Sequence, residues 1–271
     1  MQIRKDIIMQ IITSKDNEII KNIRKLNVKK YRDEMDQYII EGTKLLEEAI
    51  KEKAKIEKII VCYDCVKNNQ FESSLLYEIA KHDCLYVNQN VFDNITDVKN
   101  PQGILAIISK SSKEQSINYN EDIIVILDGV QDPGNIGTIL RTLDAIGVKQ
   151  IILSKGSADV YNPKVVRATM GAIFRVNAIE SPNLVETIKQ IKANKFEVIA
   201  SSLDTQESIY NVKFNKKAIV IGNEANGVSA EVLKSSDKKI KIPMLGKAES
   251  LNAGVAASII LYEYVRQKLN S

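Results

Sequence analysis

From Ile123 onward, the sequence alternates short apolar runs with segments of helical periodicity. Runs dominated by Ile, Val, Leu and Ala stand at 123–127, 150–154, 176–179, 196–200 and 218–222. Helical spacing of apolar residues predicts helices at 136–146, 184–193 and 252–269. Continuous apolar runs are typical of strands buried on both faces, and their alternation with helices favours a mostly parallel sheet. We therefore expect an α/β domain at 123–271.

The first 110 residues carry a smaller α/β pattern of their own. Strands are predicted at 38–40, 56–62, 85–87 and 104–108, and helices at 16–26, 44–53 and 73–81. Thr43 is expected to cap the helix at 44–53. The polar stretch from 110 to 122 has no hydrophobic periodicity and resembles a linker. We therefore expect an N-terminal domain at 1–110 and a linker at 111–122.

The composition excludes several classes of protein. Hydrophobic residues make up 44% of the 271 residues, enough to bury a core, and no apolar run is long enough to span a bilayer. The first 16 residues lack the continuous apolar region and cleavage site of a signal peptide. We expect a soluble, cytoplasmic protein with no membrane partner.

The chain has three cysteines, Cys62, Cys65 and Cys84, an odd number that argues against a disulfide framework. Together with His82 they offer four possible zinc ligands. However, Cys62 ends a predicted strand, and His82 and Cys84 are separated by a single residue. Small, buried core cysteines are therefore the favoured interpretation, and no metal is expected.

Basic residues gather at 21–32, although the net charge of the chain is only +4. The cluster holds six Lys and Arg residues, one aromatic residue, Tyr31, and no acidic residue. It could follow a phosphate backbone, with Tyr31 stacking on a base. A solvated helix face explains the cluster equally well.

Three segments follow or flank predicted buried strands, the positions at which open α/β sheets bind ligands. The first, 127–142, is a glycine-rich turn with Asn135, followed by Arg141 on the next helix. Its glycines run GxxG, so both the dinucleotide fingerprint and the Walker loop are absent. A tight turn between a strand and a helix is the alternative interpretation.

The second segment, 219–229, ends a strand at Gly222 and continues with Asn223 and Glu224. The third, 242–258, leads into a helix of small residues. Its notable residues are Pro243, Gly246, Ser250, Leu251 and Asn252. Taken singly, each segment could be an ordinary turn or a helix cap.

Together these segments resemble the three signature motifs of the SpoU–TrmH family of RNA ribose 2′-O-methyltransferases, in the SPOUT class. The resemblance covers 123 to about 268, and it departs at Ala225, where the family usually has Gly. More loosely, 29–50 resembles the opening of the small RNA-binding domain that often precedes this fold. The resemblance implies S-adenosylmethionine as cofactor, a deep trefoil knot and a homodimer.

The resemblance also implies a substrate, structured RNA, and the two-domain build favours 23S ribosomal RNA. A transfer RNA methyltransferase, an antibiotic-resistance methyltransferase and a non-catalytic RNA-binding protein are the alternatives. Contacts to RNA are expected from Arg24, Lys29, Lys30 and Arg32.

Roles for single residues follow from the same resemblance. The catalytic set would be Arg141, Asn135, Glu224, Ser250 and Asn252, with Glu224 anchoring Arg141 or its loop. The cofactor would lie against Ser202, Leu203, Thr205, Ile221, Gly222, Asn223, Ile242, Met244, Leu251 and Asn252. The single histidine, His82, lies outside the motifs, so no histidine base is expected there. The resemblance implies that Arg141 activates the 2′-hydroxyl, either as a base or by orienting the hydroxyl and stabilising its developing negative charge. The second role is favoured, because a guanidinium normally stays charged.

Overall fold

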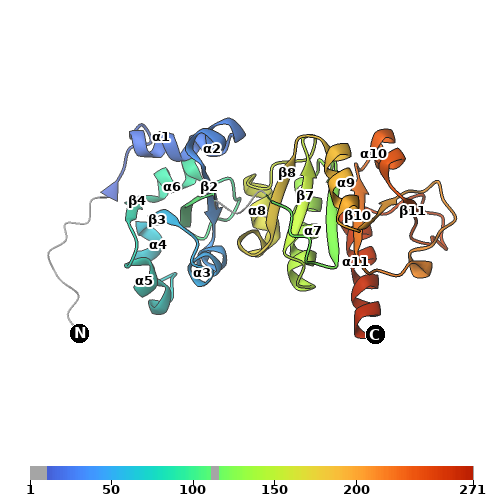
Figure 1. Ribbon diagram of the computed structural model, residues 1–271. Helices are drawn as coiled ribbons and strands as arrows, with labels where there is room; N and C mark the ends of the chain where they lie inside the picture. Colours follow the sequence, from blue (N-terminus) through green and yellow to red (C-terminus); the bar gives the residue numbers. More distant parts are fainter. Residues whose placement is uncertain (1–10, 111–115, 271) are drawn as a thin grey trace. The chain divides into compact units, whose positions relative to one another are not determined.

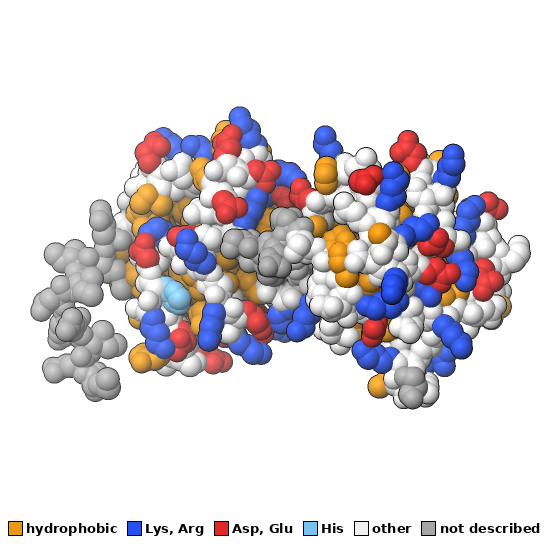
Figure 2. All heavy atoms as spheres, viewed as in Figure 1, with side chains coloured by type: hydrophobic (Ala, Val, Ile, Leu, Met, Phe, Trp, Pro, Cys, Tyr) orange, Lys and Arg blue, Asp and Glu red, His pale blue; other side chains and the backbone are white. Residues whose placement is uncertain are grey.

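The computed structural model describes residues 11–110 and 116–270, which form two compact units that divide between residues 111 and 112 (Figure 1). Residues 1–10 and 111–115 lie outside the described ranges, and with them most of the segment considered as a signal peptide and part of the predicted linker. No helix in the described ranges is long and apolar enough to cross a membrane. Lys and Arg side chains are interspersed with Asp and Glu over the face seen in Figure 2.

The N-terminal unit is built on a mixed five-stranded sheet. Its strands are β1 (Ile11–Ile12), β2 (Gln37–Glu41), β3 (Ile56–Cys62), β4 (Cys84–Val87) and β5 (Ile104–Ser109). Its helices are α1 (Glu18–Lys25), α2 (Lys29–Met35), α3 (Thr43–Lys51), α4 (Tyr63–Lys67), α5 (Ser73–Ile79) and α6 (Gln89–Ile95). The strand order is β1-β4-β3-β5-β2, with β1 and β3 parallel to β4 and with β2 and β3 antiparallel to β5.

The prediction that Thr43 caps α3 is wrong. Gly42 occupies the cap position with a φ of 103°, and Thr43 is the first helical residue. The side-chain oxygen of Gln102 accepts the Thr43 N–H at 3.0 Å and supplies the missing cap from a distant part of the chain. A side chain at position 42 would meet that oxygen, so the turn depends on glycine.

The C-terminal unit is an all-parallel six-stranded sheet, which confirms the predicted parallel architecture. Its strands are β6 (Ile123–Asp128), β7 (Gln150–Ser154), β8 (Asn177–Ser181), β9 (Glu197–Ser201), β10 (Lys217–Gly222) and β11 (Lys238–Ile240), in the order β11-β9-β10-β6-β7-β8. Its helices are α7 (Pro133–Ala145), α8 (Pro163–Thr169), α9 (Leu184–Ala193), α10 (Ala230–Ser235) and α11 (Ala253–Leu269), with 3-10 turns η1 (Ala172–Phe174) and η2 (Ile209–Asn211).

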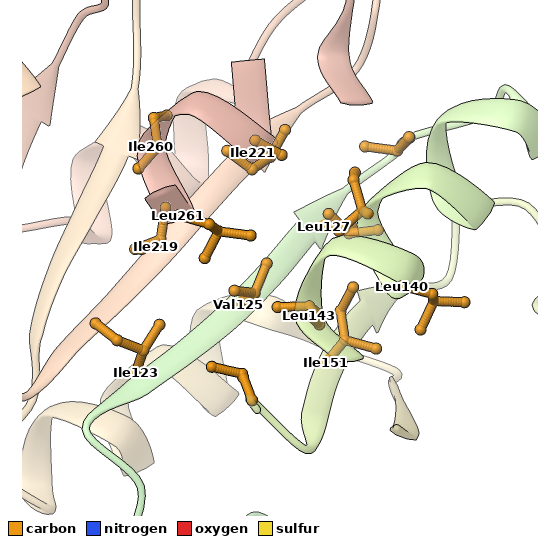
Figure 3. Close-up of a cluster of buried hydrophobic side chains, with 14 of the residues drawn as sticks. Ile123, Val125, Leu127, Leu140, Leu143, Ile151, Ile219, Ile221, Ile260 and Leu261 are labelled. Carbon is orange, nitrogen blue, oxygen red and sulfur yellow. The ribbon is translucent and has the colours of Figure 1, made fainter. Parts of the chain in front are cut away.

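Successive residues of β6 pack into two different cores. Ile123, Val125 and Leu127 join the cluster formed with α7 and α11, as Figure 3 shows. Ile124 and Ile126 join the cluster on the opposite face, which includes residues of α9 and α10. Because side chains alternate along a strand, an uninterrupted apolar run is what a strand covered on both faces requires.

The described part of the predicted linker, 116–122, lies against the C-terminal unit. Ile117 and Tyr119 pack on the core beneath α9 and α10. Asn118 donates its N–H to the side chain of Gln150 at 2.9 Å, and Gln150 donates back to the Asn118 carbonyl at 2.6 Å. This segment therefore covers the sheet just before β6 begins.

Candidate functional site

Four loops meet at the carboxyl edge of the C-terminal sheet. β6 and β10 are hydrogen-bonded neighbours, with Asp128 opposite Gly222 in the register. β9 lies beside β10, and β11 beside β9. Parallel strands end at one edge, so the segments that follow them emerge close together. These segments are 129–132, 202–208, 223–229 and 241–252.

The carboxylate of Glu224 joins the loop after β10 to the start of α7. Its Oε1 accepts the Asp132 N–H at 3.1 Å and the Asn135 side-chain amide at 2.8 Å, and its Oε2 accepts the Gln131 N–H at 3.1 Å. Burial alone would raise the pKa of this carboxyl, but the hydrogen bonds from Asn135 and the backbone outweigh burial and lower the pKa. Glu224 is therefore a charged, fully engaged acceptor rather than a proton acceptor awaiting a substrate.

The start of α7 places Asn135 inside this junction. Asp132 caps the helix by accepting the Asn135 N–H at 2.8 Å, and Pro133 is the first helical residue. Asn135 is only 5% exposed. At Gly137 a Cβ atom would lie 2.3 Å from the Cβ of Ala168, so glycine allows α7 and α8 to touch.

Asn223 organises the turn that carries Glu224. Its amide donates to the Gly129 carbonyl at 2.8 Å, and its side-chain oxygen accepts the Ala225 N–H at 3.0 Å. At Gly222 a Cβ would lie 2.1 Å from the backbone of Gly227, so the strand must end in glycine here. Ala225 is exposed and is not among the described residues with positive φ, so the departure from the family's Gly does not strain the turn.

Arg141 lies on the exposed side of α7. Its guanidinium has no hydrogen bond or ion pair with any described residue, and Glu224 therefore does not anchor it within this chain. Glu224 instead anchors the loop and Asn135, the second of the two expected arrangements. Arg141 is thus left available to an incoming group.

The third segment reaches the same junction through α11. Asn252 caps this helix by accepting the Val255 N–H at 3.2 Å. A Cβ at Gly254 would stand 3.4 Å from the Asn135 Cα, so the first turn of α11 rests directly on that of α7. Thr142 and Ser258 continue the contact with a hydrogen bond of 2.9 Å between their hydroxyls. Ser250 is exposed, and its hydroxyl has no partner among the described residues.

The residues expected to hold a cofactor lie on two adjoining segments. The Ser202 N–H donates to the Ile240 carbonyl at 2.9 Å, and the Thr205 hydroxyl to the Lys239 carbonyl at 3.4 Å. These bonds place 202–205 alongside the start of 241–252, which carries the partly buried Ile242, Met244 and Leu251. Leu203 is 66% exposed, whereas Ile221 is 3% exposed and can offer a ligand little besides its backbone.

Two residues that hold the loops of the candidate site, Asp128 and Ser154, were given no role from the sequence. The Asp128 carboxylate accepts the Ser229 N–H at 2.7 Å and ties β6 to the loop after β10. The Ser154 hydroxyl accepts the Gly129 N–H at 2.8 Å and fixes the glycine-rich turn. Both residues stand at carboxyl ends of neighbouring strands. Asp128 lies in the first of the three segments, and the same rule applied to β7 would have found Ser154 as well.

In the N-terminal unit, three of the four residues expected to contact RNA are exposed: Arg24, Lys29 and Lys30. The structure does not support the fourth, because the Arg32 side chain is 2% exposed. It donates to the Leu26 carbonyl at 2.8 Å and so holds the corner between α1 and α2. The ring of Tyr31 lies 5.9 and 5.8 Å from the ammonium groups of Lys25 and Lys30.

The cysteines of the N-terminal unit are free thiols, and Cys62 and Cys65 are buried. Burial is the main cause that raises the pKa of Cys65 and of Cys84 to about 11 in each case. Within the described residues, no three His, Cys, Asp or Glu side chains are placed to hold a metal ion.

In open, parallel α/β sheets ligands bind where the loops at the carboxyl ends of the strands come together, and in this unit these loops are joined through Glu224. Residues 122–262 match the SpoU rRNA Methylase family, and residues 17–106 match the MRM3-like substrate binding domain. The chain belongs to the SpoU rRNA methylase family. The trefoil knot is inferred for the chain from this family.

Three relatives illustrate the match. The 23S rRNA (guanosine(2553)-2′-O)-methyltransferase RlmP of Bacillus subtilis is 31% identical over 94% of this chain and 98% of its own length. The AdoMet-bound rRNA methyltransferase of Sinorhizobium meliloti has a TM-score of 0.83 and 32% identity, covering 95% of this chain and 97% of that one. The TrmH/SpoU tRNA modifying enzyme of A. aeolicus has a TM-score of 0.50 and 34% identity, covering 55% of this chain and 76% of that one.

Proposed function

We propose that this protein transfers a methyl group from S-adenosylmethionine to a ribose 2′-hydroxyl of 23S ribosomal RNA, in the cytoplasm. The observation that carries the proposal is the junction at Glu224. Through it and the contact of α11 with α7, all three family motifs meet at one edge of the sheet. Asn135 and Glu224 make the junction, and Asn252 caps the helix that rests on it. Arg141 follows Asn135 on α7 and is exposed, with no partner among the described residues.

The residues present fit S-adenosylmethionine. Its adenine base is a flat aromatic ring whose faces pack on apolar side chains, and the exposed side chains of Leu203 and Leu245 offer apolar surface on the two adjoining segments. Ser202, Thr205, Ile242 and Met244 would hold it there, with backbone from Ile221, Gly222 and Asn223. Leu251 and Asn252 would close the methionine end. The bound cofactor would supply an electrophilic methyl group on a positively charged sulfur.

The chain's own residues would prepare the nucleophile. Guanidinium groups stay protonated in proteins, so the role of Arg141 is to orient the 2′-hydroxyl or its phosphate and to stabilise the developing oxyanion. Asn135, fixed by Glu224, would position the ribose beside it. The Ser250 hydroxyl, exposed and without a partner in the described ranges, would complete the site.

Ribosomal RNA is favoured over transfer RNA by the extent of the matches. The Bacillus and Sinorhizobium rRNA methyltransferases align over more than nine-tenths of this chain, including its N-terminal unit. The A. aeolicus tRNA modifying enzyme covers 55% of it. The relative from Bacillus makes the nucleotide equivalent to guanosine 2553 of 23S rRNA the first position to test. Arg24, Lys29 and Lys30 would contact the RNA from the N-terminal unit.

The protein would work as a homodimer. Val255, Tyr262 and Leu269 are exposed by 45%, 53% and 81%, and their spacing of seven residues places them on one face of α11. An apolar stripe of this kind on a helix is what a partner covers. Sedimentation of the protein should give the mass of a dimer, and Tyr262→Glu should yield monomers. A monomeric parent protein would contradict this part of the proposal.

Mapping of blocked 2′-hydroxyls in 23S rRNA tests the proposal directly. RNA from cells that contain the protein should carry one methylated ribose that is missing from cells without it. A non-catalytic RNA-binding protein would leave the two maps identical, and a tRNA enzyme would change transfer RNA instead. Calorimetry with S-adenosylmethionine identifies the non-catalytic RNA-binding protein, because that protein would not bind the cofactor.

A further inference from the structure

The last turns of α11 carry a buried charge that the site does not use. Glu263 is 4% exposed, yet its carboxylate is fully paired. Arg266 donates to it twice, from Nε at 2.8 Å and from a terminal nitrogen at 2.7 Å, and Gln267 donates its Nε2 at 2.7 Å. The hydrogen bond with Arg266 is the main cause that lowers the pKa of Glu263, so the carboxylate stays charged in spite of its burial.

Gln267 connects the Glu263 carboxylate to the loop between β9 and β10. Its Nε2 also donates to the Val212 carbonyl at 2.8 Å, and its Oε1 accepts the Phe214 N–H at 2.9 Å. An ionised carboxylate only accepts hydrogen bonds, so Glu263 dictates which end of the amide faces it. The oxygen is therefore left pointing at Phe214. Glu263 sets the orientation of the amide, and the amide clamps the loop.

The clamped loop is the one that carries expected cofactor residues. We call residues 202–216, between β9 and β10, the cofactor loop. Its first part, with Ser202 and Thr205, is bonded to the end of β11. Its second part is bonded to α11 through Gln267 and packs Ile209, Val212 and Phe214 into the core. The loop is thus held at both ends, by segments that follow it in the chain.

We propose that Gln267 is a positioning residue that keeps the cofactor loop in the conformation that binds S-adenosylmethionine. It acts from the end of the loop distant from Ser202 and Thr205, through its bonds to Val212 and Phe214. This inference rests on the proposed function. When the bonds to Gln267 are lost, the loop samples other conformations, and the apparent affinity falls in proportion to the fraction that remains competent. The chemical step, which uses α7 and the loop after β10, is unaffected.

Gln267→Met tests the inference, because methionine keeps the length and volume of the side chain. It removes both hydrogen bonds to the cofactor loop, together with the one to Glu263. The Kd for S-adenosylmethionine, measured by calorimetry, should rise about 3-fold to 10-fold, the range expected for a buried hydrogen bond. The kcat at saturating cofactor should stay within about twofold of the parent value. Hydrogen exchange of the cofactor loop should accelerate, with that of α7 unchanged.

Lys268→Gln is the matched control. It removes a bond of 3.1 Å to the hydroxyl of Tyr264 and an ion pair of 3.9 Å with Asp122, and neither partner belongs to the cofactor loop. Its Kd should equal that of the parent. If Gln267→Met proves unstable, Gln267→Glu keeps the acceptor for Phe214 and replaces the donor by an oxygen that repels Glu263, so its Kd should rise as well.

A folded Gln267→Met protein with the parent's Kd would overturn the inference and leave the proposed function intact. A loss of kcat without a change in Kd would also overturn it, because Gln267 would then act on the chemical step. If the parent protein itself fails to bind S-adenosylmethionine, the proposed function fails instead.

Discussion

Asn135 donates its side-chain amide to the carboxylate of Glu224 over 2.8 Å, and the bond joins two segments 89 positions apart in the sequence. The same carboxylate also accepts two backbone N–H groups at the start of α7. One acidic side chain thereby sets both the position of a helix and the orientation of an amide that faces the site. Glu224 stabilises the site by geometry and charge rather than by proton transfer.

Stability should depend on the charge of Glu224. Its pKa in the folded protein lies below the ordinary value of 4.5 that the unfolded chain restores. Its contribution is therefore fully present above that value and is lost as the pH falls through the lower, folded-state pKa. Urea unfolding of the parent and of Glu224→Gln should show a difference at pH 7 that shrinks below pH 4.5.

The control for this experiment is Glu231→Gln. Glu231 is exposed on α10, and its carboxylate has no hydrogen bond with any described residue. Its substitution should leave the stability unchanged at both pH values. A difference between Glu224→Gln and the parent that stays constant from neutral to acid pH would mean that the charge of Glu224 is not what stabilises the junction.

Arg141→Ala should separate catalysis from folding. The side chain is exposed and unpaired within the described residues, so the free energy of unfolding should change by less than about 0.5 kcal/mol. Loss of a group that stabilises developing negative charge should lower kcat by about 10²-fold to 10³-fold. Methyl transfer to ribosomal RNA under single-turnover conditions measures this effect. Arg141→Lys, which keeps the charge but not the planar fork, should fall between the two, and a normal rate in Arg141→Ala would exclude the assigned role.

Gly222→Ala should disrupt the site from within. The added Cβ would lie 2.1 Å from the backbone of Gly227, which has no flexible side chain to move aside. The expected loss is about 3 kcal/mol or more in the free energy of unfolding, measured by denaturant titration. Gly246→Ala is the control, because no atom lies within 4 Å of the position that its added methyl group would take. Equal stabilities of the two variants would show that the loop after β10 can open freely.

The exposed basic residues of the N-terminal unit should contribute to the affinity for RNA and not to the free energy of unfolding. Lys29→Gln combined with Lys30→Gln removes two exposed charges. The slope of log K for RNA against log salt should become shallower by about 1.4 to 1.8, the contribution of two phosphate contacts. An unchanged slope would place the RNA elsewhere.

Arg32→Met supplies the contrast in that experiment. Arg32 is buried and bonded to the Leu26 carbonyl, so its loss should lower the free energy of unfolding by about 1–3 kcal/mol. Under conditions in which the variant is folded, the slope of log K for RNA against log salt should equal that of the parent.

Much of the fold could be predicted from local sequence alone. The parallel sheet follows from runs such as 123–127, because only a strand covered on both faces needs every side chain apolar. The helices α2, α4, α6, α8 and α10 were missed, and each has only five to seven residues, which make at most two turns and show a helical period poorly. Among the described helices of this length, α5 alone was predicted. The cap of α3 was misplaced because its acceptor, Gln102, comes from 59 positions away.

Motif order singled out Asn135, Glu224 and Arg141 as candidate site residues, and their roles stay predictions. The sequence did not say whether Glu224 holds Arg141 or the loop, because packing decides that choice. The prediction that Arg32 contacts RNA was made because this residue belongs to a basic cluster. A charged residue in a sequence can be exposed or buried, and Arg32 is buried. Gln267 carried no signal at all, since its partners Val212 and Phe214 become neighbours only when α11 meets the cofactor loop.

β10 lies between β9 and β6, although the chain completes both of those strands before β10 begins. During synthesis, β6 therefore lacks its neighbour β10 until more than 90 further residues have been added. The last piece of the site, Asn252 at the start of α11, arrives later still. Contacts of such high sequence separation form slowly and late. A chain that stops short of α11 would have all six strands of the sheet but would lack the helix that rests on α7, so we expect an immature or truncated copy not to modify RNA ahead of the complete protein.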